Sequence, residues 1–151
     1  MRSFVRYSAV HREGCLAVFD SNADRYFAPF ERDLFAEFLD ARALSEPFFV
    51  VLESERVIGC GGYYRQDGTI YLNWGMIERS QHGRGHGRFL LDRRIEQIRT
   101  ECVGQPIRIE TTQHTQGFFR KNGFGEISCA PDGFAAGLDK VEMERAAEPV
   151  A

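Results

Sequence analysis

The sequence lacks long apolar runs and a large excess of either positive or negative charge. Apolar runs such as residues 48–52 stop after five residues, whereas a transmembrane helix needs about 20. Arg2 and Arg6 stand where a signal peptide would carry its apolar stretch. We therefore expect a soluble, cytoplasmic protein with no membrane segment.

Charge and cysteine content also exclude several classes of protein. Nineteen basic and 22 acidic residues give a net charge of −3, so general binding of nucleic acid is not expected. The four cysteines stand singly, without a Cys-x-x-Cys pair, at Cys15, Cys60, Cys102 and Cys129. This pattern argues against a disulfide framework and a cysteine zinc site, and predicts reduced, mostly buried thiols and no metal.

Aromatic and aliphatic residues are plentiful enough for a folded core. The chain has 151 residues, of which 43% are hydrophobic and 13% aromatic. This length and composition favour a single domain over residues 1–146, followed by a loose tail over residues 147–151.

Hydrophobic periodicity predicts a mixed α+β fold of the α/β class. Strands are expected at 3–10, 48–52, 57–64, 69–77, 107–111, 125–130 and 138–145, and helices at 12–19, from Pro29 to about 43, after residue 87 and at 113–122. Asp20-Ser21-Asn22 is interpreted as a helix stop, and Gly75 as a mark of a β-bulge or of a close approach of backbone. The order β-α-α-β-β-β-α-β-α-β-β implies a mixed sheet with helices packed on it.

The stretch that carries chemistry is His-Gly-Arg-Gly-His-Gly at residues 82–87, between a predicted buried strand and a helix. Free N–H groups and the helix dipole at such a helix start suit a phosphate group, and glycine lets the backbone approach it closely. No Gly-Lys-Ser/Thr ending follows, so a nucleoside-triphosphatase loop is excluded. The spacing Gly-x-Gly-x-x-Gly of a Rossmann unit is also missing.

Two motifs carry a resemblance to a known family. Residues 76–87 resemble the acetyl-CoA motif of the GCN5-related N-acetyltransferases (GNAT), which reads Arg/Gln-x-x-Gly-x-Gly/Ala after a bulged strand. Residues 118–124, Phe-Phe-Arg-Lys-Asn-Gly-Phe, resemble that family's later segment Phe-Tyr-x-x-x-Gly-Phe. His82 departs from the first motif, and Phe119 replaces the tyrosine of the second. The separation of the motifs and the order of elements also match.

The resemblance implies a GNAT-like acyl-CoA N-acyltransferase fold and an acetyltransferase with acetyl-CoA as co-substrate. It implies that the main chain of Met76 and Ile77 binds the pantetheine arm and that the N–H of Ile77 polarises the thioester carbonyl. The diphosphate would be held by the amides from Arg84 to Arg88, a set made up of Arg84, Gly85, His86, Gly87 and Arg88. Phe119 would also lie beside CoA, but it cannot protonate the departing thiolate as tyrosine does.

Direct attack by an amine needs a base that removes a proton from the amine. Glu110, at the end of a predicted strand, is the first candidate, and Glu78, just after the bulge, is the second. The alternative for both is an ordinary solvated acid at a strand end.

Several side chains are given a plain structural interpretation. Arg93, Arg94 and Arg99 are expected on a solvated helix face, although one of them could reach the 3′-phosphate of CoA. His82 and His86 are four residues apart, as in a metal pair, but on a glycine-rich turn they are expected to face solvent.

Three functional hypotheses remain open at this point. The first is transfer of acetyl to a primary amine of a small molecule or peptide in a ternary complex. The second is a CoA-binding regulatory module that lost activity with the tyrosine, and the third is an RNA-directed protein that uses residues 79–99. The acceptor pocket is expected between the loops at 20–27 and 130–137, and the final strands are the candidate surface for a homodimer.

Overall fold

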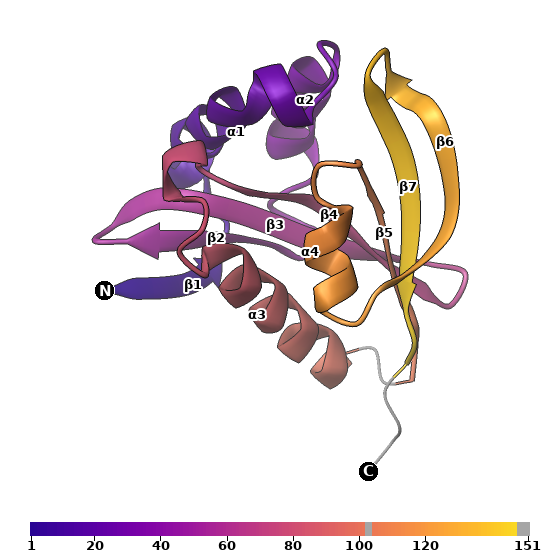
Figure 1. The fold of residues 1–151 in the computed structure, drawn as a ribbon. Coiled ribbons are helices and arrows are strands. Elements are labelled where there is room, and N and C mark those ends of the chain that lie inside the picture. The colour runs from indigo at the N-terminus through magenta and orange to yellow at the C-terminus, as the bar shows by residue number, and fades with distance from the viewer. Residues whose placement is uncertain (102–103, 148–151) are drawn as a thin grey trace.

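The computed structural model describes residues 1–101 and 104–147 and contains a seven-stranded mixed sheet (Figure 1). The strand order is β1-β2-β3-β4-β5-β7-β6, and β4–β5 is the parallel pair. The strands are β1 (Arg2–Arg6), β2 (Phe48–Glu53), β3 (Arg56–Gln66), β4 (Thr69–Ile77), β5 (Ile107–Thr111), β6 (Gly125–Ala135) and β7 (Leu138–Arg145). The predicted fold class and order of elements are confirmed. Cys102 and most of the predicted tail lie outside the described residues.

Helices cover both faces of the sheet. On one face lie α1 (Arg12–Tyr26) and α2 (Glu31–Ala41), and on the other lie α3 (His86–Glu101) and α4 (Gln116–Lys121). The apolar run of β2 follows from this arrangement, because Phe48 packs in the α1–α2 core and Phe49 in the α3–α4 core. None of the described helices is long and apolar enough to cross a membrane.

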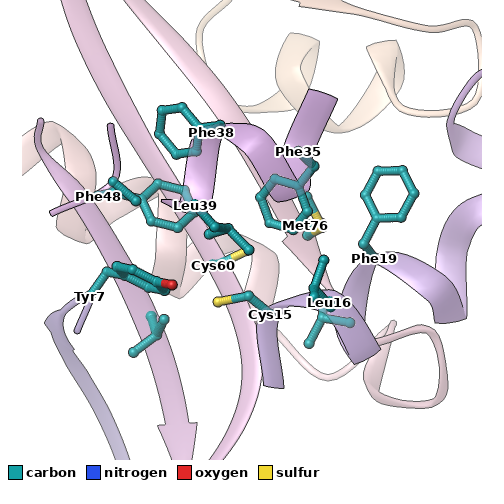
Figure 2. Close-up of a cluster of buried hydrophobic side chains, with 13 residues drawn as sticks. Tyr7, Cys15, Leu16, Phe19, Phe35, Phe38, Leu39, Phe48, Cys60 and Met76 are labelled. Atoms are coloured by element: carbon teal, nitrogen blue, oxygen red, sulfur yellow. The ribbon is translucent and has the colours of Figure 1, made fainter. Parts of the chain in front are cut away.

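The core under α1 and α2 is rich in aromatic rings (Figure 2). The ring of Phe35 stacks on Phe19 at 5.5 Å and lies 5.0 Å from Trp74, between centroids. The thiols of Cys15 and Cys60 turn toward one another in this core, and burial raises the pKa of Cys60 well above its usual value. Cys15 and Cys60 are buried, whereas Cys129 is exposed on β6, so the described thiols are mostly buried, as predicted.

The first helix runs past its predicted stop at residues 20–22 and ends at Tyr26. Ser21 Oγ and Asn22 Nδ2 donate to the carbonyl of Val18, at 2.7 and 3.0 Å. These side chains bond back to the preceding turn, which an α-helix tolerates, and so do not end the helix. The predicted loop at 20–27 is therefore mostly helical.

Three other boundaries differ from the predictions. β1 ends at Arg6, and a 3₁₀ turn follows at Ala9–His11. α2 begins at Glu31, whose carboxylate accepts the N–H of Ala28 at 2.8 Å. β6 extends to Ala135, so the expected loop at 130–137 is mostly strand.

The parallel pair β4–β5 is very short. Its register joins only Ile70 to Ile107 and Tyr71 to Arg108, whereas β4 continues to Ile77. The last six residues of β4 therefore run without a β5 partner beside them, which leaves an open edge inside the sheet.

We expect Phe35→Ala to lower the free energy of unfolding by about 3–5 kcal/mol, because the buried ring leaves a cavity between Phe19 and Trp74. Urea denaturation followed by circular dichroism measures the loss. Phe30→Ala is the control, since Phe30 is 57% exposed and its loss should cost under about 0.5 kcal/mol. Equal losses in the two variants would contradict this description of the core.

Candidate active site

A β-bulge interrupts β4 where the strand leaves β5. Asn73 pairs with Gly62 and Met76 pairs with Cys60, so Trp74 and Gly75 both stand opposite Gly61. Trp74 has a φ of +49°, which is uncommon for a residue other than glycine. The bulge predicted at Gly75 is confirmed.

The end of β4 presents the backbone of Ile77 to the open edge. The N–H of Glu78 donates to the carbonyl of Ile58 at 2.8 Å, and Ile77 stands opposite Gly59. Hydrogen-bonded pairs alternate along an antiparallel ladder. The N–H and carbonyl of Ile77 therefore point away from β3, toward the side that β5 has left.

Two side chains fix the peptide that follows Ile77. Asn22 Nδ2 donates to the carbonyl of Ile77 at 2.9 Å, and His82 Nε2 lies 2.7 Å from the same oxygen. Asn22 is buried, and its Oδ1 has no hydrogen-bond partner among the residues that the structure describes. The sequence interpretation missed Asn22 because it assigned this residue to a helix stop.

The glycine-rich turn forms an open cradle before α3. Gly83 and Gly85 have φ values of +78° and +83°, in the left-handed region that glycine enters without a Cβ penalty. No atom lies within 4 Å of where a Cβ would stand on either glycine. α3 begins at His86, and the first turn of a helix leaves its N–H groups without intrahelical partners. The turn therefore offers backbone N–H donors, glycines without side chains and open space to an anionic group.

The charged side chains at this turn lie at its rim. Arg84 Nη1 lies 3.4 Å from Gln81 Oε1, and Arg88 Nε lies 3.7 Å from Asp92 Oδ2, all on exposed side chains. Both arginines stay close to solvent and add positive charge where an anion would approach the cradle.

The two histidines of the turn have separate environments. His82 packs its ring edge against Tyr26, at 5.7 Å between centroids. His86 is buried, with Arg2 Nη1 at 3.2 Å from Nδ1 and Glu53 Oε2 at 3.7 Å from Nε2. The prediction that His86 faces solvent is wrong, because its ring fills the space between α3 and the β1–β2 edge. Among the described residues, no group of three His, Cys, Asp or Glu side chains is placed to hold a metal.

Tyr26 joins three segments at the end of the open edge. Its ring meets His82 on one side and His114 on the other, at 5.7 and 6.0 Å between centroids. His114 precedes α4, so this column of rings links α1, the glycine-rich turn and the β5–α4 connection. Periodicity gave no sign of Tyr26, because the helix was predicted to end before it.

The two predicted bases lie in different settings. The side chain of Glu110, on β5, is 39% exposed, and its Oε2 forms an ion pair with Lys140 Nζ at 2.7 Å. This contact raises the pKa of Lys140. Glu78 caps the 3₁₀ turn Arg79–Gln81, where its carboxylate accepts from the N–H and hydroxyl of Ser80. The Glu78 carboxylate is thus already engaged in local structure.

Phe119 belongs to the α3–α4 core. It is 8% exposed, and its ring meets Phe118 and Phe124 edge to face, at 5.1 and 5.5 Å between centroids. The ring of Phe118 in turn lies 3.5 Å from where a Cβ on Gly87 would stand. The second motif therefore packs against the start of α3.

The three arginines of α3 do not share one solvated face. Arg93 is exposed and pairs with Glu96 at 3.0 Å, but Arg94 is only 2% exposed. The prediction is wrong for Arg94, which occupies the same helical stripe as Leu91, Ile95 and Ile98. That spacing was a signal in the sequence, overridden by the residue's charge.

A hollow of about 420 Å³ lies between the end of α1 and the tip of the β6–β7 hairpin. It is lined by residues 23–25, Phe27, Pro29, His114 and residues 135–138. Both segments expected to shape a pocket contribute to it, although neither is the loop that was predicted.

The open strand edge, the bulge and the phosphate-type cradle together define an acyltransferase fold. The chain belongs to the acetyltransferase (GNAT) family, whose model matches residues 15–124. No curated protein matches the sequence.

Solved structures show the same fold at low sequence identity. A GNAT-family protein from Desulfovibrio desulfuricans is 23% identical, with 97% of this chain and 99% of that chain covered and a TM-score of 0.81. The Escherichia coli ribosomal-protein-S18-alanine N-acetyltransferase is 14% identical, with coverage of 100% and 97% and a TM-score of 0.78. The protein yncA from Salmonella typhimurium, solved with its cofactor acetyl-CoA, is 18% identical, with coverage of 100% and 96% and a TM-score of 0.76.

We expect Asn22→Asp to destabilise the fold by about 1–3 kcal/mol, because a carboxylate cannot donate to the carbonyls of Val18 and Ile77. Urea denaturation measures the change. Asp24→Asn is the control on the same helix, since it alters only an exposed pair with Arg79. An Asn22→Asp variant as stable as the wild type would show that the hydrogen bonds of Asn22 do not hold the end of β4.

Proposed function

We propose that this chain transfers acetyl from acetyl-CoA to a primary amine of a small molecule or peptide, by direct attack in a ternary complex. The observation that carries the proposal is the open edge of β4, which leads from the bulge to the cradle at the start of α3. An extended chain can add to such an edge while its anionic end meets the helix start.

The diphosphate of acetyl-CoA would be held by the amides from Arg84 to Arg88. The room at Gly83 and Gly85 fits this group, because side chains there would fill the cradle. The main chain of Ile77 would hold the pantetheine arm along the edge of β4. The main chain of Met76, also expected from the sequence to bind the arm, faces Cys60 on β3 by the same alternation. Phe119 would border the arm as part of the core, without polar contact.

The N–H of Ile77 would bind the thioester carbonyl oxygen. Its direction follows from the register with β3, and the two donors on the Ile77 carbonyl fix the strand end next to it. A preorganised donor stabilises the negative charge that grows on that oxygen when an amine attacks.

Glu110 would be the base that takes the proton from the amine. Its carboxylate lies on β5, is partly exposed to solvent and is held by Lys140 Nζ at 2.7 Å. Glu78 remains the second candidate, but its carboxylate would first have to leave Ser80.

The acceptor amine would enter from the hollow beside Tyr26 and His114. About 420 Å³ is a size suited to a small molecule or the end of a peptide. The E. coli neighbour acts on an alanine of a ribosomal protein by its name, so peptides with a free amino-terminal alanine belong on the acceptor panel.

A CoA-binding regulatory module is the second candidate, favoured by Phe119 at the place of the tyrosine. It predicts tight CoA binding without acetylation of any amine on the panel. The RNA hypothesis is less well supported, because Arg94 is buried and Arg93 is paired. Homodimerisation and a cytoplasmic location stay predictions.

Gly85→Ala should weaken CoA binding at least about tenfold, because alanine is strained at a φ of +83° and would narrow the cradle. Isothermal titration calorimetry with CoA measures the affinity. The control is Gly117→Ala on α4, where a Cβ meets no atom within 4 Å and φ is not positive. If both variants bind CoA like the wild type, the cradle does not hold the diphosphate.

Glu110→Gln should lower kcat about 100-fold and remove the acidic limb of its pH profile, because glutamine cannot accept the amine proton. Steady-state rates of CoA release with the best amine of the panel provide the test. Glu126→Gln, which changes an exposed carboxylate on β6, should leave the profile unchanged. An unaltered pH dependence in Glu110→Gln would rule Glu110 out as the base.

A further inference from the structure

Arg94 carries a buried charge that no described carboxylate pairs with. Its side chain is 2% exposed, although arginine is almost never fully buried without a partner. Nη1 donates to the carbonyl of Gly62 at 3.3 Å, and Nε has no hydrogen-bond partner within the described part of the chain. Across residues 1–101 and 104–147, no carboxylate forms an ion pair with Arg94.

The guanidinium lies directly behind the bulge of β4. A Cβ on Gly75 would stand 2.8 Å from Nη2, and a Cβ on Gly61 would stand 3.1 Å from Cζ. Glycine at these two facing positions therefore makes the room for the guanidinium. Gly75 is exposed and stands two residues before Ile77, on the part of β4 that β5 does not pair, so the guanidinium lies behind the open edge where the thioester would bind.

Keeping this charge costs stability. A buried ion without a counter-ion loses several kcal/mol of hydration energy. Burial lowers the pKa of Arg94 to about 10, so the group still carries its proton at neutral pH. The thiol of Cys60 is not its counter-ion, because burial raises the pKa of that thiol and keeps it neutral. An apolar side chain of similar size would suit the position better if packing were its only role.

We propose that Arg94 assists acetyl transfer through its charge. The guanidinium stabilises the negative charge that develops on the CoA sulfur as the carbon–sulfur bond breaks. The inference rests on the proposed function. The amine nitrogen forms a bond to the carbonyl carbon, its proton passes to the base, and the carbon–sulfur bond breaks with its electron pair on sulfur. Phe119 cannot supply a proton to that sulfur. A permanent cation behind the bulge allows the sulfur to leave as thiolate and to take its proton later from water.

The direct test is the pKa of the CoA thiol in the binary complex, followed by the ultraviolet absorbance of the thiolate at saturating CoA. Arg94→Met keeps most of the side-chain volume without the charge, and should raise the pKa of the bound thiol by about one unit, a tenfold lower thiolate population. Arg93→Met, which removes the exposed neighbour paired with Glu96, should leave it unchanged. Arg94→Lys should recover part of the effect.

Kinetics and stability separate this role from a purely structural one. Arg94→Met should melt at a temperature equal to or above that of the wild type, with a kcat about 10- to 100-fold lower and a KM for acetyl-CoA within about twofold. A bound thiol with the same pKa in the wild type and Arg94→Met would overturn the inference. So would an Arg94→Met variant that loses affinity for CoA while its kcat is unchanged.

The titration of the CoA thiol needs no acceptor amine, so it tests the role of Arg94 independently of whether the protein acetylates an amine. A protein that binds CoA and acetylates nothing would overturn the proposed transfer, while a thiol pKa that depends on Arg94 would still support the charge effect. Failure of the wild type to bind CoA would overturn both.

Discussion

The peptide at the end of β4 is the point on which the site depends. Asn22 from α1 and His82 from the glycine-rich turn both meet the carbonyl of Ile77, while the ladder to β3 continues at Glu78. Contacts from α1, from β3 and from the glycine-rich turn five residues further on therefore fix one peptide, and its neighbouring N–H is directed into the gap between β4 and β5. If this peptide rotated, the strand edge and the cradle would no longer lie in line.

The gap itself results from backbone geometry. The bulge at Trp74 and Gly75 turns β4 away from β5 after two paired residues, and bulges commonly redirect a strand in this way next to active sites. Glycine at residues 61 and 75 leaves the α3 side of the bulge open, and Arg94 occupies that space. The region thus combines an unpaired strand edge, a positive φ at tryptophan and a buried charge, each of which reduces stability.

Much of the fold and the cradle could be predicted from the sequence, because their signals are local. Alternation identified β4 from residue 69 to 77, and the spacing of Gly83, Gly85 and Gly87 placed the phosphate-type turn before a helix. The two motifs indicated the GNAT family, which the family model confirms.

The missed features depend on distant contacts. From its local sequence Asn22 is interpreted as a helix stop. Its role is visible only in the fold, where its side-chain amide donates to the carbonyl of Ile77, 55 residues later. From its charge Arg94 is expected to face solvent. Only the fold shows that Gly61 and Gly75 leave room for its side chain against the sheet. The extension of β6 to Ala135 depends on β7, which pairs with it across the hairpin. In each case the partner is set by the tertiary fold and not by the residue's own preference.

Backbone amide chemical shifts during a titration with CoA would locate the acyl carrier on the protein. We expect the largest shifts on Ile77 and on residues 84–88, with smaller changes at Asn22, whose side chain binds the Ile77 carbonyl. Shifts confined to another surface, or none at saturating CoA, would show that the open edge of β4 and the cradle before α3 are not where the acyl carrier binds.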